Sequence, residues 1–254
     1  LVSLLNAIES VPYVSRRQIA RVLRAWLVRV IELRTVKPRP ITLEATPELF
    51  TRIADYVVAN ETHTQGVLEQ RLVDALAVLA FSQQGWRTRG LGDGVNASNL
   101  SRRKLGDIEF ANVDQRRAIA LEAHGGHLSA TYVNDHARSL SRIVEQRLAE
   151  SWAAIDDPAA WTVEVLFVAH SKDISGLPDD DVLHGVNISY QYASYDDLLE
   201  RAWINSSREE QAAALDIHVI QHLNGTTVRE SVRNKFREIA TQAAPASSSE
   251  GTND

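Results

Sequence analysis

Two short β-strand patterns near the middle of the chain carry acidic residues at matched positions. GDIEFAN (106–112) and RAIALEAH (117–124) alternate apolar and polar residues on either side of a polar turn, which predicts a β-hairpin. A turn midway between them places Asp107 directly opposite Glu122, with Cβ atoms about 4.5–5.5 Å apart on one face. Like charges at that separation destabilise a hairpin unless something binds them. The pair therefore predicts a site for a divalent cation.

The two faces of this hairpin differ because side chains alternate along a strand. His124 shares the face of Glu122, whereas Ile108 and Leu121 point to the opposite face and into a core. A histidine can accept a proton near neutral pH or bind a metal ion. The alternative interpretation is that the acidic face is exposed to solvent, where its charges are screened.

Helices and strands alternate around the hairpin. The apolar spacing predicts, in order, a helix opened by Thr64, the hairpin, a helix over 129–155, strands over 161–170 and 186–195, and helices over 208–223 and 227–241. The sequence therefore predicts an α/β fold of the mixed α+β kind, with a central mixed sheet flanked by helices and an N-terminal helical extension.

The order of these elements and acids resembles the PD-(D/E)xK nuclease superfamily, which includes restriction endonucleases. A helix with Glu69 precedes a strand with Asp107, then a strand with Glu122-x-His124, and the resemblance covers about 64–202. It implies a restriction endonuclease-like core in which Asp107, Glu122 and Glu69 bind Mg²⁺ or Mn²⁺. These three acids and His124 are then the expected catalytic residues.

His124 stands where the family has a lysine that orients or activates the attacking water. A histidine can replace part of that role because it exchanges a proton near neutral pH. Lys104, three residues before Asp107, is another candidate for the missing positive charge.

Basic residues lie on both sides of the hairpin in the sequence. Those expected to contact DNA phosphates, in a salt-sensitive and sequence-independent way, are Arg87, Arg89, Arg102, Arg103, Lys104, Arg138 and Arg142. The resemblance thus implies a Mg²⁺-dependent deoxyribonuclease that acts on double-stranded DNA in restriction or defence. Cleavage of both strands would favour a homodimer, since two sites must face two strands.

The N-terminal region is basic although the whole chain has a net charge of −6. Eight of the first 40 residues are Lys or Arg and two are Glu, and Ser15 can cap an amphipathic helix. That helix could contact DNA or form a dimer. We expect a basic helical region over 1–60, the core over 61–241 and a disordered tail over 242–254.

The composition excludes several kinds of chemistry. The chain has no Cys, so it has no disulfides, thiolate nucleophiles or Cys-based zinc sites. It has no apolar run near the ~18 residues that span a bilayer and no signal-peptide pattern, so we expect a cytoplasmic protein with no membrane partner. Two alternatives to the nuclease remain. One is a catalytically impaired DNA-binding relative, and the other is a protein-interaction module whose basic helices bind an acidic partner.

Overall fold

The chain divides into two compact units, Leu1–Arg39 and Pro40–Asp254. The computed structural model describes residues 8–34, 39–94, 99–150, 152, 157–173 and 175–242. The predicted disordered tail, apart from its first residue, lies outside these ranges. The structure places the division after residue 39 and not near residue 60, because helix α3 (Pro47–Val58) buries Phe50 and Ile53 in the core of the second unit.

The first unit contains one long helix, α2 (Tyr13–Arg34), where the sequence predicts an amphipathic helix. Among its apolar side chains, Val22, Trp26 and Ile31 are each more than 60% exposed. Among the described residues, none of the helices is both long enough and apolar enough to cross a membrane.

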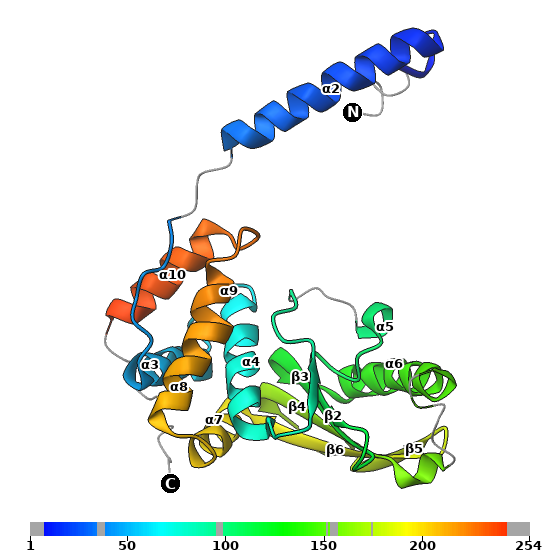
Figure 1. The fold of residues 1–254 in the computed structure, drawn as a ribbon, viewed down its shortest axis with the longest axis vertical. Coiled ribbons are helices and arrows are strands. Elements are labelled where there is room, and N and C mark those ends of the chain that lie inside the picture. Colours follow the sequence, from blue (N-terminus) through cyan, green and yellow to red (C-terminus); the bar gives the residue numbers. More distant parts are fainter. Residues whose placement is uncertain are drawn as a thin grey trace. The chain divides into compact units, whose positions relative to one another are not determined.

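The second unit is built on a six-stranded mixed sheet with the strand order β1-β2-β3-β4-β6-β5 (Figure 1). Its strands are β1 (Arg87–Arg89), β2 (Ile108–Asn112), β3 (Arg117–Leu128), β4 (Thr162–Lys172), β5 (Asp180–Leu183) and β6 (Val186–Ser194). Strands β3, β4 and β6 run parallel, whereas β1, β2 and β5 are antiparallel to their neighbours. The predicted mixed sheet flanked by helices is therefore confirmed.

The hairpin of β2 and β3 has the predicted register. Ile108 pairs with Leu121 and Glu109 with Ala120, so the same register continued by one residue sets Asp107 opposite Glu122. Glycine is required at position 106, just before Asp107, because a Cβ there would lie 2.6 Å from the carbonyl oxygen of Leu121. The short turn and the apolar alternation are local features, which is why the sequence predicts this pairing.

Helices cover both faces of the sheet. On one face Ile108 and Leu121 pack, as predicted, into a core shared with α4 (Val67–Phe81) and α7 (Tyr195–Ile204). On the other face Ala120 belongs to a second core formed with α6 (Ala130–Ala149). The face that carries Glu122 is therefore covered by α6, and Glu122 itself is 7% exposed. The alternative of a solvent-exposed acidic face is wrong.

The remaining helices are α5 (Asn99–Arg102), η1 (Pro158–Ala160), α8 (Arg208–Ala214), the π-helix η2 (Leu215–Ile220), α9 (Gln221–Leu223) and α10 (Glu230–Thr241). Side-chain caps fix several helix starts. Thr46 accepts a hydrogen bond from the backbone N–H of Leu49 at the start of α3, and Ser129 accepts one from Tyr132 at the start of α6. The cap at Ser129 directs α6 back along the sheet next to the end of β3.

Candidate active site

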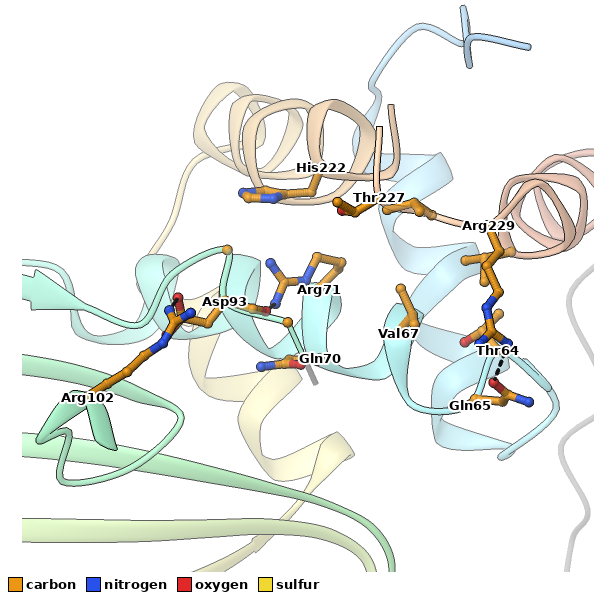
Figure 2. A pocket seen from close by; sticks show the side chains of 14 residues that line it. Thr64, Gln65, Val67, Gln70, Arg71, Asp93, Arg102, His222, Thr227 and Arg229 are labelled. Atoms are coloured by element: carbon orange, nitrogen blue, oxygen red, sulfur yellow. Dashed lines mark hydrogen bonds and ion pairs between the residues drawn. The ribbon is translucent and has the colours of Figure 1, made fainter. Parts of the chain in front are cut away.

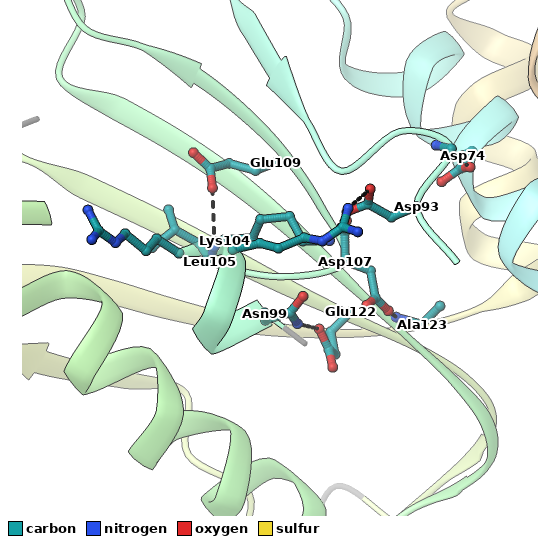
Figure 3. A network of polar contacts seen from close by, with 12 residues as sticks. Asp74, Asp93, Asn99, Lys104, Leu105, Asp107, Glu109, Glu122 and Ala123 are labelled. Atoms are coloured by element: carbon teal, nitrogen blue, oxygen red, sulfur yellow. Dashed lines mark hydrogen bonds and ion pairs between the residues drawn. The ribbon is translucent and has the colours of Figure 1, made fainter. Parts of the chain in front are cut away.

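Asp107 and Glu122 line one hollow of about 380 Å³ at the end of the β2–β3 hairpin. Helix α6 contributes Tyr132 and His136 to its wall, and the N-terminus of α5 contributes Asn99. One oxygen of Asp107, Oδ2, accepts a hydrogen bond from the backbone N–H of Ala123 at 3.1 Å (Figure 3). The structure thus brings together the two acids that the sequence placed opposite each other.

Three side chains hold the carboxylate of Glu122. Asn99 donates to Oε2 at 2.9 Å, the hydroxyl of Tyr132 donates to Oε1 at 2.9 Å, and Nδ1 of His136 lies 3.5 Å from Oε1. Burial raises the pKa of Glu122, but its hydrogen bond and charge interaction with His136, with the bonds from Tyr132 and Asn99, outweigh burial and leave the pKa below its usual value. Glu122 is therefore held as a carboxylate.

Asp107 has the opposite tendency. Burial and then the negative charge of Glu122 raise the pKa of Asp107 to about 7, although the N–H of Ala123 and the charge of Lys104 act against the rise. Near neutral pH the two acids therefore hold a proton between them for part of the time. A cation that binds both would replace that proton and remove the repulsion.

Lys104, the other candidate for the positive charge of the family's lysine, lies next to Asp107. Its Nζ donates to the backbone oxygen of Asp107 at 2.8 Å and pairs with Oδ2 of Asp93 at 2.8 Å. The side chain is only 3% exposed, so Lys104 faces the acids and is not available to a phosphate at the protein surface. This burial argues against its predicted role as a DNA-contacting residue.

Glu69 does not join the Asp107–Glu122 pair. It accepts hydrogen bonds from Thr62 and Thr64, and it lines a separate hollow with Gly125. Among the described residues, no group of three or more His, Cys, Asp or Glu side chains is placed to hold a metal ion. The structure therefore does not bring Glu69 together with Asp107 and Glu122, the other two acids that the sequence predicts to bind a metal ion.

Asp74, another acid on helix α4, interacts electrostatically with Asp107. The side chain of Asp74 is fully buried, accepts a hydrogen bond from the N–H of Gly92 at 3.1 Å and pairs with Arg71 at 2.8 Å. Burial raises the pKa of Asp74 to about 7, and the charge of Asp107 adds to the rise. Asp74 was not among the predicted site residues; the signal that indicates it is an acid within the apolar stretch LVDALA (72–77).

His124 lies on the face of Glu122, as predicted, and its ring packs against Tyr132 in a tilted arrangement with centroids 4.2 Å apart. It does not line the hollow of Asp107, whereas His136 does. Nε2 of His136 also lies 3.2 Å from the backbone oxygen of Leu105, so this ring bridges α6 and the segment before β2. No local pattern indicates His136 because its partners are 14 and 31 positions away along the chain.

The remaining arginines predicted to bind DNA are all exposed. Arg87 and Arg89 lie on β1 at the edge of the sheet, and Arg138 and Arg142 lie on α6. Three of the predicted set also have acidic partners: Arg102 pairs with Asp93, Arg103 with Glu150 and Arg138 with Asp135. Exposed pairs of this kind are weak, so a phosphate can replace the acid.

Comparisons with known proteins do not assign this chain to a family. Neither the models of known protein families nor the curated proteins include a match to the sequence. The function therefore has to be argued from the carboxylate pair and its surroundings.

Proposed function

We propose that the protein is a metal-dependent endonuclease that hydrolyses DNA phosphodiester bonds, of the restriction or defence type. The observation that supports it most is the pairing of a half-buried Asp107 with a buried Glu122, because burial and the charge of Glu122 raise the pKa of Asp107 to about 7. Two acids kept this close and shielded from water destabilise the fold unless they serve a purpose, and perturbed carboxylates in a hollow are typical of catalytic sites.

The residues present suit Mg²⁺ or Mn²⁺. Mg²⁺ prefers oxygen ligands and usually keeps several of its waters, so one or two carboxylates are enough to bind it. Asp107 and Glu122 would be these ligands, which makes a third acid such as Glu69 unnecessary. When bound, the ion would supply positive charge to the phosphate and lower the pKa of a water.

The surrounding side chains have separate tasks. Asn99 and Tyr132 orient the carboxylate of Glu122 by hydrogen bonds to its two oxygens. Lys104, buried beside Asp107, supplies permanent positive charge next to the site, where the scissile phosphate would add negative charge. His124 remains the candidate, from the sequence pattern, for accepting a proton from water; it packs against Tyr132 outside the lining of the hollow, so the proposal depends on Asp107 and Glu122 and not on His124.

The test is cleavage by Asp107→Asn and Glu122→Gln, measured as nicking of plasmid DNA in Mg²⁺ or Mn²⁺. We expect both variants to lose cleavage, whereas Glu145→Gln, an exposed acid on α6, should retain it. Thermal unfolding provides the check on folding. Either variant at the pair removes one of two repelling charges, and Asp107→Asn should keep or raise the melting temperature. Full cleavage by either variant would overturn the proposal.

A second candidate is a catalytically impaired DNA-binding protein. It is favoured by the full set of hydrogen bonds to Glu122, both of whose oxygens already accept bonds from Asn99 and Tyr132. It predicts salt-dependent binding of DNA by the wild-type protein without nicking in either metal. Absence of DNA binding would exclude both candidates and favour a protein-interaction module.

A further inference from the structure

A hollow of about 710 Å³ lies between α4, the loop 90–94 and the turn that joins α9 to α10 (Figure 2). It is distinct from the hollow of Asp107 and Glu122, and the two share no lining residue among those described. Its volume is in the range of small-molecule sites, about 300–1,000 Å³.

The charge of this hollow favours an anion. Arg71, Arg102 and Arg229 line it, and Asp93 is the single acid among the lining residues that the structure describes. Figure 2 shows Arg102 and Arg229 toward opposite ends with Arg71 between them. Arg71 is itself 5% exposed, so water screens its charge poorly. Its Nη1 pairs with Oδ2 of Asp74 at 2.8 Å, but burial raises the pKa of that acid to about 7, so Asp74 balances the charge of Arg71 only in part near neutral pH.

Arg229 has N–H donors beyond the one used in the hydrogen bond described for it. It is exposed, and the bond described for it is a long one, from Nη1 to Oε1 of Gln65 at 3.3 Å. A guanidinium has five N–H donors, and two of them can bind the oxygens of one phosphate. Thr227, two residues earlier, adds a hydroxyl to the same rim.

A buried acceptor in the same wall lacks a donor. Gln70 is 6% exposed, and its Oε1 accepts no hydrogen bond among the described residues. A buried acceptor without a partner destabilises the fold, so a ligand with an N–H or O–H group would gain affinity by donating to it. Val67, Val228 and Val232 provide an apolar surface beside it. The wall thus suits a molecule that combines an anion, a hydrogen-bond donor and an apolar ring.

The loop 90–94 packs tightly against His222 at one side of the hollow. Gly92 has a φ of +78°, and a Cβ there would lie 2.2 Å from Cε1 of His222, so the loop 90–94 rests against this imidazole. His222 lies in α9, which follows directly after the π-helix η2, a rare conformation that occurs frequently at functional sites. Burial and the charge of Arg71 lower the pKa of His222, which leaves a neutral ring at neutral pH.

We infer that this hollow binds a nucleoside phosphate, with the phosphate on Arg71 and Arg229 and the base or sugar donating to Gln70. A free nucleotide and the phosphorylated end of a DNA strand present the same chemistry. Asp93 connects this hollow to the carboxylate pair, since it pairs with both Arg102 and Lys104. The inference stands without cleavage and requires no metal ion.

The test is isothermal titration calorimetry in EDTA with adenosine monophosphate, inorganic phosphate and adenosine. We expect the nucleotide to bind more tightly than either part alone. Arg229→Gln should weaken nucleotide binding about ten-fold or more, because a charged hydrogen bond is lost. Arg208→Gln is the control, since Arg208 is also an exposed arginine and its partner, Glu48, lies away from the hollow.

A 5′-phosphorylated oligonucleotide and its unphosphorylated counterpart distinguish the two sources of ligand. Tighter binding of the phosphorylated strand than of the free nucleotide would assign the hollow to a strand end, and equal binding would assign it to a free nucleotide. The inference is overturned if the nucleotide binds no better than phosphate, or if Arg229→Gln and Arg208→Gln behave alike. Because EDTA is present throughout, these results are independent of whether the protein cleaves DNA.

Discussion

The ion pair between Glu109 and Arg147 is the buried contact that fixes the segment before Asp107 to helix α6. Nη1 and Nη2 of Arg147 lie 2.6 and 2.7 Å from the two carboxylate oxygens, and the side chains are 1% and 4% exposed. Arg147 also donates to the backbone oxygen of Arg103, and Glu109 accepts from the N–H of Leu105 at 3.1 Å. One pair thus holds residues 103–105, and with them Lys104.

Loss of one partner should destabilise the protein strongly. Glu109→Gln leaves the guanidinium of Arg147 buried without its counter-charge, which costs about 3–5 kcal/mol in comparable sites. Arg147→Met leaves the carboxylate of Glu109 alone and should cost a similar amount. In the double variant both charges are absent, so it should cost no more than either single change. The coupling energy is then about 3 kcal/mol or more.

Guanidinium chloride unfolding, followed by tryptophan fluorescence, measures these free energies of unfolding. Trp152 is a suitable reporter, since its ring stacks on Trp161 with centroids 4.3 Å apart and lies 5.5 Å from the guanidinium carbon of Arg147. Additive costs in the double variant, or single costs below about 1 kcal/mol, would refute the reasoning, because those are the values of an exposed pair.

Two further predictions concern the hollows. Gly92→Ala should lower the free energy of unfolding by about 1–2 kcal/mol, because the φ of Gly92 is positive. It should also weaken nucleotide binding, because the new Cβ displaces His222. An unchanged denaturation midpoint would contradict this prediction. Burial lowers the pKa of His136, but Glu122 raises it more, so the folded pKa lies above the ordinary 6.5. The stability that His136 contributes is therefore complete below pH 6.5 and is lost as the pH rises through the folded pKa. His136→Gln should flatten this fall in thermal melts from acid to mildly alkaline pH, and an unaltered slope would contradict the assignment.

The hairpin could be predicted from the sequence because its determinants are local. The alternation around Asp107 and Glu122 and the short turn between the strands specify both the pairing and the shared face, and the structure has the predicted register. The burial of the hairpin face that carries Asp107 and Glu122 could not be predicted from the hairpin sequence alone. It arises because β4 adds parallel to β3 and α6 covers both strands, and these are contacts between distant segments.

The choice of acid on the first helix could not be predicted from spacing. Glu69 and Asp74 both lie on α4, and which of them turns toward Asp107 depends on how the helix is rotated against the sheet. Thr62 and Thr64 hold Glu69 elsewhere, while the N–H of Gly92 fixes Asp74. The domain boundary differs for a similar reason, since α3 packs against α7, α8 and α10, more than a hundred residues later in the chain, as well as against nearby α4.

The long C-terminal helix over residues 208–223 changes its winding in the middle. At the end of η2 the N–H of Gln221 donates to the oxygen of Asp216, five residues back, where an α-helix would use the residue four back. Shortening this stretch by one residue would turn everything beyond it by about 100° around the helix axis. His222 would then face away from the loop at Gly92, so natural or engineered deletions here should damage the molecule more than changes of residue type.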